Sequence, residues 1–294
     1  MAKVDTKPCK ACGGKIPVDR TQCPHCRTMN VDVILSADKD GTIRLSECAD
    51  TEYVKRIPTG PWDINFGTHF DDEGTAFSGI VDTSVTLLGG KAGAGKSTLS
   101  MQLANTFVEA TNVKTNPPCK EHPRCNRRDV LYLSAEEGNN QLRARAKRLG
   151  ITVVNQYHIV LVPLGVKVEL ANILLGRKPA AVIGDSLSKI APDMDEAVKF
   201  CDNIRSYCEE LKMPAILIDH INKDGDFAGF ETLQHSVDCS LMFTIDTDKI
   251  RILETLKNRN GEDGVKTFLK MTSKGLVLHI DDDDAGDEDD DDED

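Results

Sequence analysis

The sequence has no apolar run near the roughly 20 residues that a membrane-spanning helix needs. Its first residues, MAKVDTK, lack the apolar stretch of a secretory signal peptide. We therefore expect a cytoplasmic protein without a membrane partner. Because cysteines stay reduced in that compartment, a regularly spaced subset of the ten cysteines predicts metal ligands rather than disulfides.

The sequence also lacks a positive net charge, which at first argues against binding to nucleic acid. The formal net charge is −12, but residues 281–284 and 287–294 hold twelve acidic side chains. The rest of the chain is therefore neutral. The acidic tail, residues 281–294, is predicted to be disordered and solvated. It would serve solubility, compete with DNA for the protein's own basic surface, or bind a basic protein partner.

Strand-like apolar runs alternate with helical stretches over residues 79–280, as in VTLLGG, VLYLSAEE, AAVIGDS and AILIDH. This alternation predicts an α/β domain whose central sheet is mostly parallel, with helices on both faces. Residues 31–78 combine a possible hairpin with loop-like sequence and are interpreted as a linker and lead-in segment. We expect four parts: residues 1–30, 31–78, 79–280 and 281–294.

The segment GKAGAGKS matches the P-loop pattern GxxxxGK[ST] and lies directly between a predicted strand and a predicted helix. Its glycines let backbone amides surround phosphates, Lys96 reaches the β- and γ-phosphates, and the Ser97 hydroxyl holds Mg²⁺. ATP and Mg²⁺ are the predicted cofactors. The predicted nucleotide-binding residues are Gly90, Lys91, Ala92, Gly93, Ala94, Gly95, Lys96, Ser97 and Thr98.

Carboxylates end two other predicted strands. Asp185 ends AAVIGDS and is predicted to hold Mg²⁺ through water. Glu136 and Glu137 end VLYLSAEE, at the strand end where doubly wound sheets bind ligands. Adjacent side chains on a strand point to opposite faces, so one of the two serves the γ-phosphate. We predict that Glu136 is catalytic and that Glu137 caps the following helix.

Four cysteines near the N-terminus form two CxxC pairs separated by ten residues: Cys9, Cys12, Cys23 and Cys26. This spacing predicts a structural zinc ribbon within residues 1–30, because four thiolates suit a closed tetrahedral Zn²⁺ site. A redox pair or unpatterned thiols are the alternatives. A second candidate metal site comprises Cys119, His122 and Cys125, for which the alternative is an exposed basic loop.

The ribbon followed by LLGGKAGAGKSTLSMQ, VLYLSAEEGNNQLRARAKRLG, VIGDSLSKI, HINKDG and KNRNG resembles the bacterial RadA (Sms) family of DNA-repair ATPases, from about Pro8 to Ile280. The resemblance implies a RecA-like core and a hexameric ring on single-stranded or branched DNA. It implies ATP hydrolysis between subunits, branch migration or helicase activity in recombination, and a nucleoid-associated location in a bacterial cell or phage-infected host. Lys96 and Ser97, Glu136, and Asp185 match the family's Walker A residues, catalytic glutamate and Walker B acid.

The resemblance also assigns residues outside the phosphate-binding segment. KNRNG matches the family motif KNRFG, which implies that Lys257 and Arg259 act on the nucleotide of the neighbouring subunit; taken alone, they would be a solvated basic face. The stretch from residue 219 to 229 corresponds to the family's DNA-facing loop and offers His220, Lys223 and Phe227. The alternative is an ordinary flexible loop.

Two departures from the family stand out. The sequence lacks the Lon-protease-like C-terminal domain, and residues 68–78 look like an insertion. With the acidic tail, this architecture suggests a bacteriophage or mobile-element version of the family. The leading functional hypothesis is an ATP-dependent DNA motor for recombination or repair. The alternatives are a phage-type replicative DNA helicase and a DNA-independent scaffold switched by nucleotide.

Overall fold

The computed structural model describes residues 6–8, 15–17, 55–70, 74–110, 128–163, 170–220 and 228–279. The chain divides into two compact units, residues 1–52 and 53–294. In the first unit, β1 (Thr6–Pro8) and β2 (Lys15–Pro17) pair antiparallel. Several predicted features lie outside the described residues: the four ribbon cysteines, Cys119, His122, Cys125, Lys223, Phe227 and the acidic tail.

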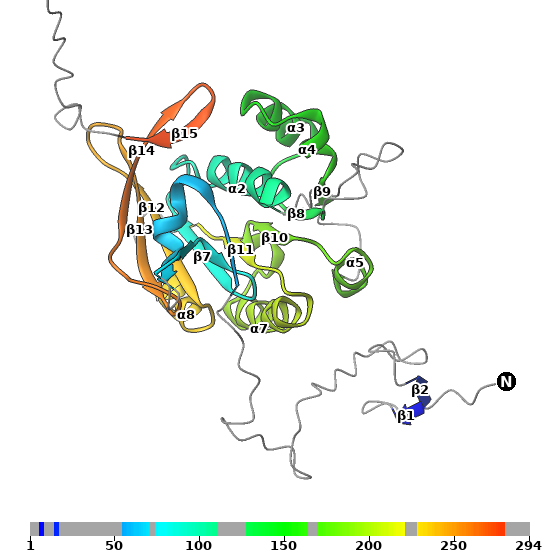
Figure 1. Ribbon diagram of the computed structural model, residues 1–294. Coiled ribbons are helices and arrows are strands. Elements are labelled where there is room, and N and C mark those ends of the chain that lie inside the picture. The colour runs from blue at the N-terminus through cyan, green and yellow to red at the C-terminus, as the bar shows by residue number, and fades with distance from the viewer. Residues whose placement is uncertain are drawn as a thin grey trace, which may run out of the picture. The chain divides into compact units, whose positions relative to one another are not determined.

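The second unit is built on a nine-stranded sheet with the order β15-β14-β13-β12-β7-β11-β10-β8-β9 (Figure 1). Six neighbouring strands are parallel: β7 (Val85–Gly90), β8 (Val130–Ser134), β9 (Ile159–Pro163), β10 (Ala181–Asp185), β11 (Ala215–Ile218) and β12 (Cys239–Ile245). Three antiparallel strands extend one side: β13 (Arg251–Asn258), β14 (Lys266–Thr272) and β15 (Gly275–Leu278). The predicted α/β class with a mostly parallel sheet is confirmed.

Helices cover both faces of this sheet, as Figure 1 shows. One face carries α2 (Lys96–Ala110), α3 (Asn139–Arg148) and α4 (Val153–Tyr157). The other carries α5 (Leu170–Arg177), α6 (Leu187–Ile190), α7 (Met194–Leu211) and α8 (Ala228–His235). Successive strand residues point to opposite faces, so Tyr132 joins the core under α2 while Leu131 and Leu133 join the core under α7. Strands buried on both faces explain the continuous apolar runs in the sequence.

Helix α7 shows how local sequence sets these boundaries. The Asp193 side chain accepts a hydrogen bond from the backbone amide of Glu196 at 2.7 Å and so caps the first turn. The helix buries an apolar stripe at three- and four-residue spacing: Ala197, Cys201, Ile204 and Cys208. It ends at Leu211, and the C-cap residue Lys212 adopts a left-handed conformation with φ of 50°. The stripe anchors α7 against the central strands, whose ends carry the predicted site.

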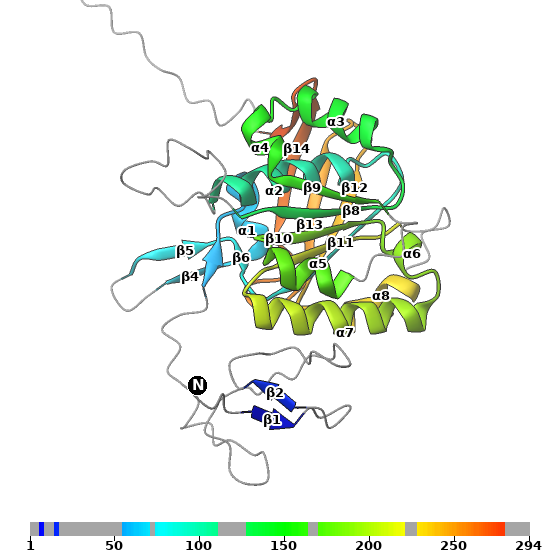
Figure 2. The same ribbon diagram turned by 90° about the vertical axis from the view of Figure 1, so that its right-hand side faces the viewer.

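The lead-in residues 55–81 pack onto the same unit. They form β3 (Arg56–Ile57), the short 3₁₀ helix Gly60–Trp62, α1 (Asp63–Phe66), β4 (Thr68–Phe70), β5 (Ala76–Ser78) and β6 (Ile80–Val81). Trp62 and Phe66 are buried in the core that contains α2. Strands β4 and β5, within the predicted insertion, pair as a hairpin that projects from the sheet in Figure 2. Among the described residues, no helix is long and apolar enough to span a bilayer.

Candidate functional site

The predicted phosphate-binding segment joins the end of β7 to the start of α2. Gly93 and Gly95 have φ values of 80° and 116°, a region that other residues rarely adopt. A Cβ atom on Gly95 would lie 3.1 Å from both Met271 Cε and Phe243 Cε1. The loop can therefore fold tightly in front of α2, whose first-turn amides and dipole favour an anion.

Lys96 lies at the centre of this loop and is only 4% exposed. Its Nζ donates hydrogen bonds to the carbonyl oxygens of Gly90 at 2.5 Å and Lys91 at 3.0 Å. His220 Nδ1 lies 3.3 Å from the same amine. Burial lowers the pKa of Lys96, while the carboxylates of Asp185, Glu136 and Asp219 act in the opposite direction. A cation so placed faces carboxylates from three strand ends.

Asp185 is the last residue of β10 and is 3% exposed. Its Oδ2 accepts a hydrogen bond from the Tyr132 hydroxyl at 2.9 Å, and the Ser97 side chain also hydrogen-bonds the carboxylate. Burial raises the pKa of Asp185, and these hydrogen bonds partly offset that rise. Its buried Oδ1 has no hydrogen-bond partner among the described residues. The two predicted magnesium residues, Ser97 and Asp185, are therefore adjacent, with one carboxylate oxygen available to an ion or its water ligand.

Glu136 follows β8 and meets residues from two neighbouring strand ends. Its Oε1 accepts a hydrogen bond from Ser186 Oγ at 2.6 Å, and its Oε2 lies 3.0 Å from His220 Nε2. Burial raises the pKa of Glu136, but the hydrogen bonds from Ser186 and His220 outweigh it, so the net shift is downward. The ligand atoms of Glu136, Asp185 and His220 lie within 4.8 Å of one another. His220, assigned to a DNA-facing loop by resemblance, thus contacts both Lys96 and Glu136.

Glu137 points elsewhere, as expected for adjacent strand residues. Its carboxylate forms a bidentate ion pair with Arg145 of α3. It does not act as the predicted helix cap, because Gly138 is the N-cap and its backbone amide donates to the Gln141 side chain at 3.1 Å. Glu137 therefore anchors α3 and leaves the site to Glu136.

Lys257 and Arg259 lie at the opposite edge of the sheet. Strand β13 runs antiparallel to β12, so Lys257 pairs with Ser240 near the start of β12, whereas Phe243 near its end pairs with Gly90. Lys257 Nζ donates to Val237 O at 2.8 Å, and Arg259 Nη1 to Asp238 Oδ1 at 3.1 Å. The six-residue β7 separates the edges by roughly 20 Å. These two cations therefore lie far from their own P-loop.

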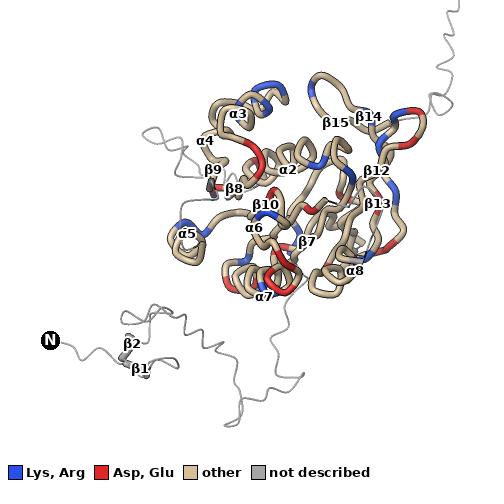
Figure 3. Tube along the Cα trace, turned by 180° about the vertical axis from the view of Figure 1, so that it is seen from behind, with Lys and Arg blue, Asp and Glu red and all other residues tan. Residues whose placement is uncertain are grey.

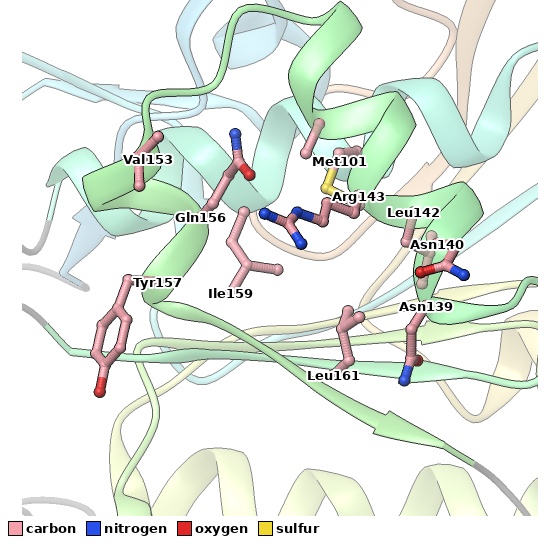
Figure 4. Close-up of a pocket in the computed structure, with 11 residues that line it drawn as sticks. Met101, Asn139, Asn140, Leu142, Arg143, Val153, Gln156, Tyr157, Ile159 and Leu161 are labelled. Carbon is pink, nitrogen blue, oxygen red and sulfur yellow. The ribbon is translucent and has the colours of Figure 1, made fainter.

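An apolar pocket of about 420 Å³ lies apart from this group, between α2, α3, α4 and β9. Figure 4 shows Arg143 pointing toward Gln156 and Ile159 across it. None of the predicted site residues lines it. Helix α3 also carries basic residues, which are blue in Figure 3: Arg143, Arg145, Lys147 and Arg148.

Sequence reasoning missed three side chains that support the site. Tyr132 and Ser186 hold Asp185 and Glu136, and Arg251 Nε donates to the P-loop carbonyl of Ala94 at 3.1 Å. A tyrosine inside an otherwise aliphatic strand was the one available signal, because a buried hydroxyl requires a partner. Arg251 gave no signal, since its contact joins segments 157 residues apart.

Comparison with known proteins agrees with this geometry. The AAA domain family matches residues 75–226, a little over half of the chain. The DNA repair protein RadA of Aquifex aeolicus (strain VF5) is 28% identical over 91% of this chain, and that of Treponema pallidum (strain Nichols) is 28% identical over 91%. The chain spans 58% and 57% of the length of these curated relatives.

A solved structure shows the same fold. The KaiC-like protein PH0186 from Pyrococcus horikoshii OT3 superposes with a TM-score of 0.56 at 17% identity, covering 78% of this chain and 100% of that one. At this identity the likeness establishes the fold alone. The matching family, the relatives and the fold agree with the P-loop and its strand-end carboxylates. The chain therefore belongs to the AAA domain family and is a P-loop ATPase of the RadA/RecA superfamily.

Proposed function

We propose that this ATPase is a motor that acts on single-stranded or branched DNA in recombination or repair, and that it hydrolyses ATP between subunits of a hexameric ring. One observation carries the proposal. The P-loop group lies at one edge of the sheet, and the basic pair Lys257 and Arg259 lies at the other. A head-to-tail ring joins two different surfaces of each subunit, and these two edges are the surfaces proposed to meet. Similarity to proteins named for DNA repair supports the DNA substrate.

The phosphate groups of ATP suit the residues at the P-loop. Lys96 would exchange its hydrogen bonds to the Gly90 and Lys91 carbonyls for phosphate oxygens, which are charged and therefore stronger acceptors. Ser97 and Asp185 would hold Mg²⁺, which supplies positive charge against the phosphates. The unpartnered Oδ1 of Asp185 supports this fit.

Glu136 is the proposed acceptor of a proton from the attacking water. The hydrogen bonds that lower its pKa favour the ionised form, and the ionised form is the one that can accept a proton. Ser186 and His220 each hold one of its carboxylate oxygens, so its orientation is fixed from two sides. His220 Nδ1 also lies 3.3 Å from Lys96, and a movement of the lysine toward phosphate would therefore be felt by Glu136.

Lys257 and Arg259 are proposed to stabilise charge on the nucleotide of the neighbouring subunit. Asp238 supports this role because its Oδ1 accepts from both Arg259, at 3.1 Å, and Arg205, at 2.6 Å. Burial and the adjacent Arg259 lower the pKa of Lys257. The pair is thus held at the sheet edge before any partner binds.

Three further regions are proposed to govern DNA binding. The segment from residue 219 to 229, which includes His220, would contact single-stranded DNA and report that contact to Glu136. Residues 1–30 would fold around Zn²⁺ held by Cys9, Cys12, Cys23 and Cys26 and would bind DNA or a partner protein. The acidic tail would compete with DNA for basic surface or bind a basic partner.

The test is steady-state ATP hydrolysis with and without single-stranded DNA at moderate salt. The intact chain is compared with Lys96→Ala and with a chain that ends at Ile280. The proposal expects DNA to accelerate hydrolysis at least tenfold, and Lys96→Ala to abolish hydrolysis while leaving the fold intact. Tighter DNA binding by the shortened chain would identify the tail as the competitor of DNA. Hydrolysis that ignores DNA in both chains would instead favour a nucleotide-switched scaffold.

A further inference from the structure

The hairpin of β4 and β5, which projects from the sheet in Figure 2, begins beside the segment that carries Arg259. A Cβ atom on Gly67, directly before β4, would lie 2.9 Å from the carbonyl oxygen of Asn260, directly after Arg259. The Arg56 side chain donates to the carbonyl oxygens of both Gly67 and Asn260. The base of the hairpin is therefore fixed to the sheet edge that is proposed to reach the neighbouring subunit.

The two faces of this hairpin differ. The register pairs Phe70 with Ala76 and His69 with Phe77, so the two phenylalanines lie on opposite faces. Phe70 is 61% exposed, and its neighbour Ala76 is exposed as well. In the sequence, Phe70 directly precedes the three acidic residues 71–73. One face of the hairpin therefore combines an exposed aromatic ring with a small neighbour, next to a block of negative charge.

The apolar pocket between α2, α3, α4 and β9 is open to solvent. Its volume of about 420 Å³ falls within the roughly 300–1,000 Å³ of sites that enclose a bound group. Leu142 and Leu161 line it, together with Val153 and Tyr157 of α4, which are 82% and 50% exposed. Aromatic anchors of protein interfaces fill pockets of this apolar kind. The pocket can thus receive an aromatic side chain from another chain.

Positive charge lies on the α3 side of this pocket. Arg143 lines the pocket and points across it in Figure 4, and Lys147 follows one turn later on the same helix. Both side chains are exposed. Helix α3 begins at Asn139, which also lines the pocket and follows Glu136 by three residues. The pocket therefore reaches the sheet edge that carries Glu136, whereas the hairpin lies at the edge that carries Arg259.

We propose that the β4–β5 hairpin of one subunit docks into this pocket of the next, with Phe70 inside it and the acidic residues 71–73 near Arg143. An apolar projection and a pocket on different parts of one chain make a head-to-tail contact, which can repeat around a ring. Opposite charges beside the apolar contact fix its register. Docking rests on the proposed function, because it requires the head-to-tail ring. It would also hold Arg259 of one subunit close to Glu136 of the next.

The test is assembly of the full chain with Mg²⁺ and a non-hydrolysable ATP analogue, followed by sedimentation velocity over a range of protein concentrations. Phe70→Asp and Val153→Asp should each raise the dissociation constant between subunits at least tenfold, because each places a charge in the apolar contact. Phe77→Asp, on the opposite face of the hairpin, is the control for the first variant. Val154→Asp, next to Val153 but outside the pocket lining, is the control for the second. Each control should change the constant less than threefold.

A mixture gives a result that a folding defect cannot imitate. Phe70→Asp chains keep the pocket, and Val153→Asp chains keep the hairpin, so a mixed pair can form one intact contact. Chains with different fluorescent labels should form heterodimers at concentrations at which neither variant alone associates. The charges are tested by Arg143→Glu, whose weaker assembly should be restored at least fivefold by a partner chain with lysine at all three of residues 71–73.

Equal losses in the docking variants and their controls would overturn the docking. So would a mixture that associates no better than its separate components. Rings that form normally in Phe70→Asp and Val153→Asp would overturn the docking and leave the proposed ring in place. A wild type that stays monomeric with both nucleotide and DNA would overturn both. Assembly that depends on Phe70 and Val153, in a chain whose hydrolysis ignores DNA, would support the docking and contradict the motor.

Discussion

The Tyr132 hydroxyl donates a 2.9 Å hydrogen bond to Asp185 Oδ2 between the neighbouring strands β8 and β10. Ser100 Oγ lies 2.9 Å from the same hydroxyl, and Ser100 also donates to Ser97 O at 3.2 Å. A buried hydroxyl thus connects the first turn of α2 to the carboxylate proposed to hold Mg²⁺. The arrangement fixes one oxygen of Asp185 and leaves the other available.

Tyr132→Phe should therefore weaken the binding of Mg²⁺ more than the binding of the nucleotide. The variant removes one donor to Asp185 and keeps the ring in place, so the carboxylate gains rotational freedom. We expect the Mg²⁺ concentration for half-maximal hydrolysis to rise several-fold and the free energy of unfolding to fall by about 1 kcal/mol. Magnesium titrations of hydrolysis and thermal unfolding measure the two effects. Ser100→Ala, which keeps the Tyr132–Asp185 bond, is the control, and an unchanged titration for Tyr132→Phe would contradict a positioning role.

The pH profile of hydrolysis should depend on Ser186. The folded chain holds the pKa of Glu136 below its ordinary value of 4.5, so the carboxylate's stabilising contacts are present above that value and are lost as the pH falls through the folded pKa. Ser186→Ala removes a hydrogen bond that favours the ionised form. The acid limb of the rate profile should then move to higher pH, so the hydrolysis rate falls more at acid pH than on the neutral plateau. An acid limb that stays in place would show that another group limits the rate.

His220 should separate basal hydrolysis from its stimulation by DNA. Its ring contacts Lys96 through Nδ1 and Glu136 through Nε2, and His220 belongs to the proposed DNA-facing segment. For His220→Ala we expect DNA stimulation to fall at least tenfold, with ATP affinity changed by less than about threefold. Hydrolysis rates across a DNA titration, together with calorimetric ATP affinities, distinguish these effects. Equal losses of affinity and stimulation would indicate that His220 only supports the P-loop.

The sequence was informative wherever function depends on short-range order. The P-loop glycines, Lys96 and the acidic strand ends lie within local patterns, because each strand of a parallel sheet delivers its last residue to the same edge. The α/β class could also be predicted, because the alternation of strand-like and helical stretches is visible in short segments of the sequence. Residues 31–78 were harder to interpret: their loop-like composition hid Trp62 and Phe66, which pack into the core beside α2.

Contacts between distant segments could not be predicted from these patterns. Arg56 donates to the carbonyls of Phe66, Gly67, Gly79 and Asn260, and so joins the lead-in segment to the end of β13. Nothing in the order of residues indicates such a contact. The role of Glu137 also depended on α3, where Arg145 lies about two turns after the N-cap Gly138.

Strand β13 connects the two sheet edges on which the proposed mechanism depends. Arg251 at its start contacts the P-loop of its own chain, and Lys257 near its end lies at the other edge of the sheet. If ATP is hydrolysed between subunits, two inactive variants with defects at opposite edges should complement each other. Lys96→Ala damages one edge and Arg259→Ala the other, and each alone should lose at least 10³-fold in hydrolysis rate.

The most direct measurement is therefore ATP hydrolysis by an equal mixture of Lys96→Ala and Arg259→Ala chains, assembled together on single-stranded DNA. In a ring of randomly mixed subunits, about a quarter of the interfaces would combine an intact P-loop with an intact Arg259. We predict that the mixture recovers up to about a quarter of the wild-type rate, while a mixture of Lys96→Ala with Ser97→Ala, which share one edge, recovers none. A mixture no more active than its separate components would contradict hydrolysis between subunits.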